Sequence, residues 1–370
     1  MKNKLIAGIW AVIIISVAIA IIRPIVLDNA QKVKFEDDMM GLMIGVSSEA
    51  KSMEEFRKEN LKEVRNLDVG YTGHYDTLVD IEMCQQLEWL SVGSAEYEQE
   101  RERWPGPESE ERIRQIKKEL GEILKNCPKL SFMVLKGTEN YFELKDLDFL
   151  KNGQNLEYLS LEHHGDLDYS AVCQCSNLRT LDFWDCRVTE LDMLSGLNKL
   201  ESLGLLETDV TEAGDIPELK TLKELEIRNT PLGGNEEQLG IILDNCPNIE
   251  QLCLSGENGE LNNLEFLKSG KNMWELVLKG QVIDDYSTIA ACPQLRRLTL
   301  TGCNISDFSI ISGLENLESL HVSRTNISES KDILNLKNLK KLYIVDTPLA
   351  ENEQELALIY QQFPNIEIVK

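Results

Sequence analysis

Large apolar residues recur along most of the chain in the pattern L-x-x-L-x-L. In one unit, Leu178-Arg-Thr-Leu181-Asp-Phe183, apolar and polar residues alternate, which is typical of a short strand with one buried face. The intervals between units are 23, 43, 26, 22, 22, 22, 27, 24, 22, 22, 22 and 27 residues. The units start at Val64, Leu87, Leu130, Leu156, Leu178, Leu200, Leu222, Ile249, Met273, Leu295, Leu317, Leu339 and Ile366. This constant phase predicts repeated structural units rather than several globular domains.

Stacking explains why such units occur together. A unit of about 22 residues is too small to bury its own leucines. A neighbour displaced by one strand spacing, about 4.7–4.9 Å, covers those leucines and pairs with the backbone. Residues 64–370 are therefore predicted to form an α/β solenoid of about 12 repeats, whose short strands build a curved parallel sheet.

The pattern resembles the leucine-rich-repeat family, and within it the 22-residue bacterial type found in internalins. That family often carries Asn eight positions after the first Leu of a unit, where its side chain bonds to neighbouring backbone. Here Thr and Cys occupy the position, at Thr72, Thr138, Cys186, Thr208, Thr230, Cys303, Thr325 and Thr347. The resemblance implies a scaffold fold, with a similar but weaker ladder of side-chain hydrogen bonds.

A longer period lies above the short one. The five units that start between Leu156 and Ile249 recur 117 residues later, between Met273 and Ile366, which indicates a duplicated block. Each block closes with a longer unit, whose apolar residues at i, i+3, i+4 and i+7 predict a helix. These residues are Leu239, Ile242, Leu243 and Cys246 in the first block, and Leu356, Ile359, Tyr360 and Phe363 in the second. A charged insertion at Glu98–Glu111 is expected to be an exposed loop that leads into a similar helix.

The segments before the repeats predict an anchor and a cap. Leu5–Ile22 is an 18-residue run without a charged side chain, preceded by Lys2 and Lys4. A transmembrane helix needs about 20 apolar residues, whereas the apolar part of a signal peptide has roughly 7–15. Residues 1–30 are therefore predicted to be a signal anchor with a short linker, and residues 31–63 a helical N-terminal cap with two short helices. The bulk of this single-pass protein of the cell membrane would then be extracytoplasmic, or secreted if the apolar segment is cleaved.

Composition narrows the class of partner. The chain has 63 acidic and 38 basic side chains and a formal charge of −25, which argues against nucleic acid as a partner, because nucleic-acid binding depends on Lys and Arg at phosphates.

The nine cysteines mostly occur at fixed repeat positions, so we interpret them as small buried hydrophobic residues. A disulfide has some geometric support only between Cys84 and Cys127, which share a phase in adjacent units.

The sequence contains no recognisable reacting constellation. There is no Ser/His/Asp grouping, no glycine-rich phosphate loop, no paired-carboxylate signature and no C-x-x-C pair. His163 and His164 are consecutive, so they point to opposite sides of an extended segment and do not suit one metal ion. The chain is therefore expected to lack enzymatic activity, a cofactor and a metal site.

Exposed aromatic residues mark the candidate site. In the predicted sheet, side chains two, four and six positions after each start face outward from the concave surface, and those at three and five face the core. The candidate partner-binding residues are Trp89, Phe132, Tyr158, Trp184, Leu206 and His163. Because successive units stack, we expect them to form one contiguous strip that binds a protein or peptide. The alternative is that the rings pack against each other or against the Glu98–Glu111 insertion.

These features predict non-catalytic protein–protein recognition by a membrane-tethered extracytoplasmic solenoid. The alternative is a secreted or surface-displayed adhesin with a host or cell-wall ligand. The last strand, which opens at Ile366, is followed by no evident cap, so a homodimer through this strand edge is a further expectation.

Overall fold

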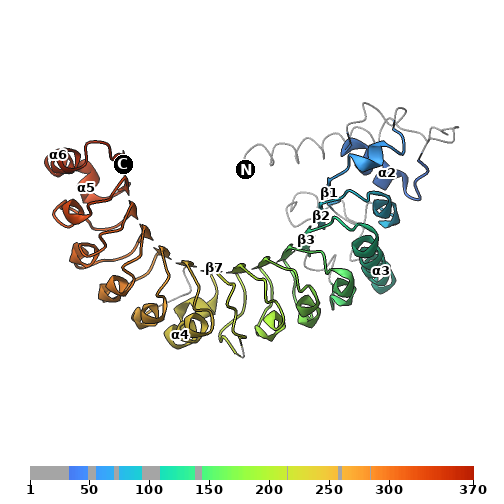
Figure 1. The fold of residues 1–370 in the computed structure, drawn as a ribbon, viewed down its shortest axis with the longest axis horizontal. Helices are drawn as coiled ribbons and strands as arrows, with labels where there is room; N and C mark the ends of the chain where they lie inside the picture. The colour runs from blue at the N-terminus through green and yellow to red at the C-terminus, as the bar shows by residue number, and fades with distance from the viewer. Residues whose placement is uncertain are drawn as a thin grey trace.

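The computed structural model describes residues 33–48, 56–70, 75–93, 109–137, 144–214, 216–256, 261–283 and 285–370. Within these residues the strands form one thirteen-stranded parallel sheet, in which each strand pairs with the next one along the chain. Figure 1 shows that the sheet lines the inner side of an arc and that the helices lie on its outer side. The strands are β1 (Asn66–Asp68), β2 (Trp89–Val92), β3 (Phe132–Lys136), β4 (Tyr158–Glu162), β5 (Thr180–Trp184), β6 (Ser202–Leu206), β7 (Glu224–Arg228), β8 (Gln251–Ser255), β9 (Glu275–Lys279), β10 (Arg297–Thr299), β11 (Ser319–His321), β12 (Lys341–Tyr343) and β13 (Glu367–Val369).

Each strand is followed by a return segment on the outer side. Most return segments are single-turn 3-10 helices, such as η5 (Asp148–Asn152) and η6 (Ser170–Gln174). The longer units carry α-helices, as the i, i+3, i+4 pattern predicts: α3 (Glu110–Asn126), α4 (Glu236–Asn245) and α6 (Glu353–Gln362), the last one preceded by the single turn α5 (Pro348–Glu351). In α4 the Asn235 side chain caps the helix by accepting from the Gln238 amide at 3.3 Å. Asn352 caps α6 at the equivalent position, 117 residues later.

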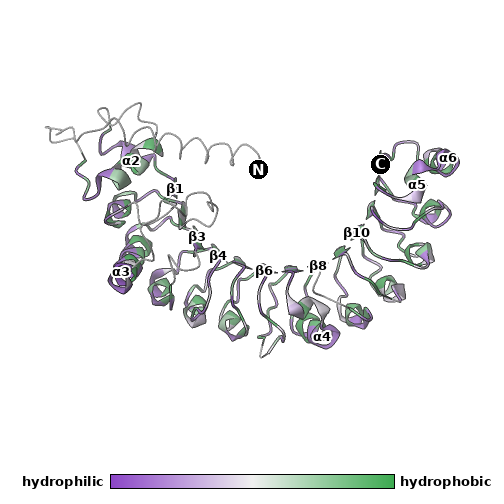
Figure 2. Cartoon of the chain, turned by 180° about the vertical axis from the view of Figure 1, so that it is seen from behind, coloured by the Kyte–Doolittle hydropathy of each residue, from purple (hydrophilic) through white to green (hydrophobic). Residues whose placement is uncertain are grey.

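The core is one continuous cluster between the sheet and the return segments. It contains residues at the third position of the units, among them Leu159, Leu181 and Leu203, all essentially inaccessible to solvent. Figure 2 shows hydrophobic and hydrophilic residues side by side in nearly every coil, as expected for coils with one buried side. The expectation that positions three and five face the core is confirmed.

A ladder of side chains runs along the eighth position. Four of the side chains there donate to the main-chain carbonyl at position five of the preceding unit, which ties adjacent coils together, whereas Thr325 and Thr347 donate to a carbonyl of their own unit. The pairs are His164 with Leu135 and Cys186 with Leu161 at 3.2 Å, Thr230 with Leu205 at 3.2 Å, and Cys303 with Leu278 at 3.4 Å. Burial lowers the pKa of His164 to about 4 and raises that of Cys186 to about 11, so both side chains are neutral at pH 7. Thr72 and Thr138 lie outside the described residues.

The seventh position turns the chain away from the sheet with a left-handed backbone. From β4 onward this position has a positive φ in every unit, although six of these residues are not glycine. They are His163, Asp185, Glu207, Asn229, Arg324 and Asp346, with φ between 49° and 58°, and the others are Gly256, Gly280 and Gly302. The turn therefore follows from the repeat geometry rather than from the residue type.

The N-terminal cap is anchored by two buried carboxylates. Helix α2 (Asp38–Val46) and the short 3-10 helix η1 (Asn60–Lys62) precede β1 within the described residues, and residues 49–55 of the predicted two-helix cap lie outside them. Asp80, 3% exposed, accepts from the amides of Glu36 at 2.9 Å and Asp37 at 2.8 Å. Asp37, 5% exposed, caps α2 by accepting from the Met40 amide at 2.8 Å.

The last strand departs from the predicted phase. Leu342 on β12 pairs with Ile368, whereas its equivalent Leu225 on β7 pairs with Leu252, which lies one residue further along its unit. Ile366 still makes the turn bond of a unit start, because its amide donates to the Phe363 carbonyl at 3.1 Å, so the shift lies in the pairing of β13 with β12. The shift places Ile368 on the core side of β13, where it packs against the core.

Two other expectations fall on residues that the structure does not describe. The predicted anchor at Leu5–Ile22 lies outside the described residues, as does most of the Glu98–Glu111 insertion. Among the helices that are described, none is both long and apolar enough to cross a bilayer. Helix α3, which follows the insertion, is present as predicted.

Candidate functional site

The aromatic residues at the second position form a ladder across β2, β3 and β4. Strand register brings Trp89 beside Phe132 and Phe132 beside Tyr158. The Phe132 and Tyr158 rings stack at a centroid distance of 3.7 Å with an angle of 3° between their planes, and Trp89 tilts against Phe132 at 6.2 Å. All three side chains remain half-buried. We call Trp89, Phe132 and Tyr158 the aromatic ladder.

The other predicted site residues lie at the far end of the strands. Trp184, 41% exposed, contacts the His163 ring at a centroid distance of 5.5 Å, and its register partner on β6 is Leu206. His163 also contacts Asp185, with 2.8 Å between Nδ1 and Oδ2. Among the described residues no ring contact joins this group to the aromatic ladder. The six residues thus form two groups at opposite ends of the strands rather than one strip.

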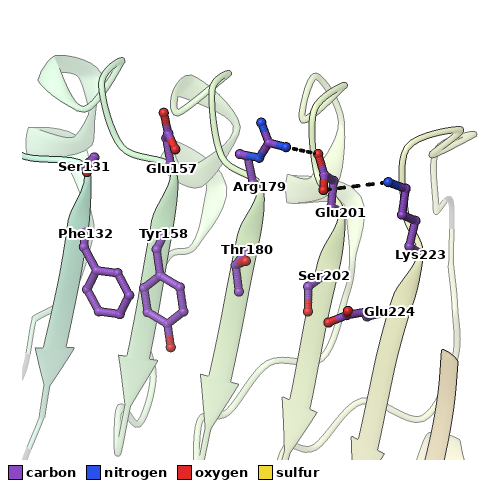
Figure 3. A pocket seen from close by; sticks show the side chains of 10 residues that line it. All are labelled: Ser131, Phe132, Glu157, Tyr158, Arg179, Thr180, Glu201, Ser202, Lys223 and Glu224. Carbon is purple, nitrogen blue, oxygen red and sulfur yellow. Dashed lines mark hydrogen bonds and ion pairs between the residues drawn. The ribbon is translucent and has the colours of Figure 1, made fainter.

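A groove of about 350 Å³ borders the aromatic ladder (Figure 3). Phe132 and Tyr158 form one end of it and the exposed Glu224 on β7 the other, with the short side chains of Thr180 and Ser202 between them. The hydroxyl of Tyr158 donates to Asp182 at 2.8 Å, which fixes the ring above the sheet.

Charged residues at the first position of each unit form the rim of this groove. Arg179 pairs with Glu201, and Lys223 lies 4.0 Å from the same carboxylate. Figure 3 shows these side chains above the row that contains Thr180, Ser202 and Glu224. The rim cations are therefore engaged with Glu201 and not with the carboxylate of Glu224.

A second hollow of about 200 Å³ lies deeper in the face, over β5 to β9. Gly204 forms part of it, and a Cβ at this position would come within 2.5 Å of Asp182 Oδ1. Four carboxylates line it. Glu275 pairs with Arg297 at 3.6 Å, and we call the other three, Asp182, Glu224 and Glu226, the carboxylate trio. Burial, reinforced by Glu226, Glu162 and Glu224, raises the pKa of Asp182, although its hydrogen bond from Tyr158 opposes that shift.

The sequence pattern did not single out the carboxylate trio. Its members occupy the outward second and fourth positions, but acidic residues there look like any solvated acidic surface. The signal that marks them is the absence of matching cations on the neighbouring strands, together with glycine at 204. The aromatic ladder was found because large rings at outward positions are unusual in a charged sheet.

Within the described ranges, no group of three or more His, Cys, Asp or Glu side chains has the geometry to hold a metal ion. Cys84 and Cys127 are free thiols, as are the other seven cysteines, so the possible disulfide between them is not formed. Burial raises the pKa of both thiols to about 12, which makes them poor nucleophiles at neutral pH.

Solved structures identify the fold. An internalin, inlF, from Listeria monocytogenes matches with a TM-score of 0.57 and 17% sequence identity, over 91% of this chain and 95% of that chain. The structure of a TLR13–ssRNA13 complex matches with a TM-score of 0.56 and 17% identity, over 86% of this chain and 49% of that chain. No family model matches the sequence. Together with the thirteen-stranded parallel sheet and its repeat register, these matches show that the chain is a leucine-rich-repeat solenoid, similar in fold to this internalin.

Proposed function

We propose that the chain is a non-catalytic recognition protein that binds a protein or peptide partner on the concave face of its sheet. The observation that carries this proposal is the aromatic ladder beside an open groove. Stacked rings that stay half-buried offer a preformed apolar surface whose ordering cost is already met within the fold. The two alternatives for these rings, packing together and binding a partner, are compatible, because the stack leaves one face of Tyr158 toward the groove.

The proposed setting is extracytoplasmic, with the chain tethered to the cell membrane through Leu5–Ile22. The support is the uncharged 18-residue run and the two lysines that precede it. A secreted or surface-displayed adhesin is the alternative, and it requires cleavage after Ala20. N-terminal sequencing of the mature protein separates the two, because the adhesin would start near Ile21.

We also propose that nucleic acid is not the partner. The formal charge of −25 supports this, because phosphate binding draws on Lys and Arg. The TLR13 structure contains RNA on the same fold, so the fold itself does not decide the question. Electrophoretic mobility of a labelled single-stranded RNA with the full chain at low salt tests it, and a stable shifted band would contradict the proposal.

Peptide selection tests the recognition function. Random peptides displayed on phage are selected on the immobilised full chain, and the selected peptides are then titrated against Phe132→Ala/Tyr158→Ala. We expect this variant to weaken binding roughly tenfold or more, because aromatic anchors carry much of an interface's binding energy. Val282→Ala, an exposed apolar residue in a turn, serves as the control and should bind as the parent does. Selected peptides that bind the aromatic variant as well as the parent would contradict a site on this face.

A further inference from the structure

The carboxylate trio differs from Glu162 and Glu275, two other acidic residues of the concave face, in its lack of cation partners. Glu162 lies 3.6 Å from Lys136 on β3, and Glu275 lies 3.6 Å from Arg297 on β10. In the described part of the chain, by contrast, Asp182, Glu224 and Glu226 have no Lys, Arg or His nitrogen within 4.0 Å. Their hydrogen-bond donors are neutral: Tyr158 for Asp182 and Gln251 for Glu224, at 2.8 and 2.6 Å. The trio therefore carries negative charge that no ion pair among the described residues balances.

Deepening the proposed function, on which this inference rests, we propose that the concave face binds an extended basic peptide whose Lys or Arg side chain enters the hollow over Gly204 and pairs with Asp182, Glu224 and Glu226. The occupant follows from charge complementarity. A cation in this hollow meets carboxylates on β5 and on β7, while β6 between them contributes only the small Ser202 and Gly204 to this part of the face.

Steric room supports the same occupant. Gly204 is the one fourth-position neighbour of the trio without a side chain, which lets the Asp182 carboxylate lie across it: a Cβ there would come within 2.5 Å of Asp182 Oδ1. The hollow of about 200 Å³ that Gly204 and the trio line suits the end of one long side chain rather than a folded domain. A basic residue fits because its apolar stem lies along the sheet while its charged head reaches the carboxylates.

The dimensions of the face fit an extended peptide that crosses the strands. Tyr158 on β4 and Glu224 on β7 are three strands apart, or about 14 Å at a spacing of ~4.7–4.9 Å. An extended chain covers this distance in about four residues, at ~3.3–3.4 Å per residue. The same peptide can therefore place one apolar side chain against the open face of Tyr158 and a cation over the trio.

Peptide composition and charge variants test the inference. In the phage selection on the full chain, we expect Lys and Arg to be enriched over Asp and Glu. Selected peptides are then titrated by fluorescence anisotropy against Glu224→Gln/Glu226→Gln, and affinity should fall roughly tenfold, with the loss shrinking at high salt. The matched control is Glu190→Gln/Glu212→Gln, which removes the same charge from exposed return segments and should leave affinity unchanged. Replacing the peptide's basic residue by Gln should lower its affinity for the parent protein by a similar factor. The same replacement should hardly change its affinity for Glu224→Gln/Glu226→Gln, because the partner carboxylates are already absent.

The outcomes separate this inference from the proposed function. Selected peptides without Lys or Arg, or peptides that bind Glu224→Gln/Glu226→Gln as well as the parent, overturn the basic-peptide inference. If those peptides still lose affinity on Phe132→Ala/Tyr158→Ala, recognition by the concave face stands. If neither variant pair changes binding, both proposals fail. An equal loss on the control variant would show that only the net charge matters, and it would also overturn the inference.

Discussion

At the residue scale, the seventh position of the units from β4 to β12 keeps a left-handed backbone whether or not the residue there is glycine. A left-handed conformation costs a non-glycine residue roughly 1–2 kcal/mol, and Asn and Asp tolerate it best. Glu207 has neither advantage, yet its φ is 56°. Its side chain is exposed, so nothing in the core requires it there.

Glu207→Gly is therefore expected to stabilise the protein. Relief of the left-handed strain should outweigh the entropy that glycine loses on folding, for a net gain of about 0.5–1 kcal/mol in the free energy of unfolding. Urea denaturation followed by circular dichroism measures it. Gly280→Ala, at the same position with a φ of 69°, should have the opposite effect. A Glu207→Gly protein that unfolds at lower urea would contradict the strain argument.

The carboxylate of Asp182 makes stability depend on pH. Burial and the acidic groups on both flanks, Glu162 on β4 and Glu224 and Glu226 on β7, raise its pKa above the unfolded value. The folded state therefore holds the proton more tightly, and this group's contribution to stability falls as pH rises from the unfolded to the folded pKa.

Asp182→Asn is expected to remove this dependence. The variant should be more stable than the parent at pH 7, on the order of 1 kcal/mol, and near parity at pH values below the unfolded pKa. Its amide oxygen can still accept from Tyr158, so the ring should stay in place. Thermal melts at a series of pH values check the sign, and a variant that is less stable at pH 7 would refute it.

Much of the residue-level architecture was predictable, because burial repeats with the period of the units. Leu159 and Leu181 could be placed in the core from spacing alone, and Cys186 in the ladder from its position. The groove was only half predictable. Phe132 and Tyr158 stand out as rings, whereas Asp182 acquires its raised pKa from burial and from acidic neighbours on β4 and β7, which spacing does not reveal.

At the element scale, α-helices were predictable and 3-10 helices were not. The seventeen residues of α3 display a full amphipathic period, while a segment such as η7 (Asp192–Leu194) is too short to show one. The shift of β13 was also beyond the pattern. Ile366 and Ile368 are two residues apart and both pack against the core, so the apolar pattern does not reveal that β13 pairs one residue out of register.

The cap should respond to Asp80 as a separate element. Asp80→Ala leaves the buried amide of Asp37 and the partly buried amide of Glu36 without an acceptor, at a cost of about 1–3 kcal/mol. Hydrogen exchange measured by mass spectrometry should show faster exchange in α2 and β1. Since each coil contacts mainly its neighbours, β10 to β12 should exchange as in the parent. A uniform increase along the chain would contradict this local loss.

At the scale of the whole molecule, the two copies of the duplicated block have different surroundings. Leu243 on α4 is 2% exposed, because the following coil covers it. Its equivalent on α6, Tyr360, is 47% exposed, and Leu358 beside it is 45% exposed. Strand β13 pairs with β12 on one side. This end of the described solenoid thus presents apolar side chains beside a strand edge.

The predicted homodimer through this edge remains to be tested. We expect residues 1–370 to self-associate, and Tyr360→Lys with Val369→Lys to abolish the association, because charges on an edge oppose pairing. Sedimentation velocity of the full chain in a mild detergent measures the species present. Val282→Lys, which adds charge at a residue 71% exposed elsewhere, should leave the dimer intact. Monomer alone at high concentration would exclude it.

The row of left-handed residues at the seventh position also differs in side chains between the two copies of the duplicated block. His163 and Asp185 in the first block correspond to Gly280 and Gly302 in the second, 117 residues later, and Glu207 corresponds to Arg324. The seventh-position row of the first block thus carries an imidazole and two acids, whereas the equivalent row of the second block carries two glycines and a guanidinium. A ligand that contacts the seventh-position row can therefore distinguish the first block from the second, although the two blocks have the same repeat pattern. The scaffold is thus internally repeated, yet its surface can bind an asymmetric ligand in one orientation along the arc.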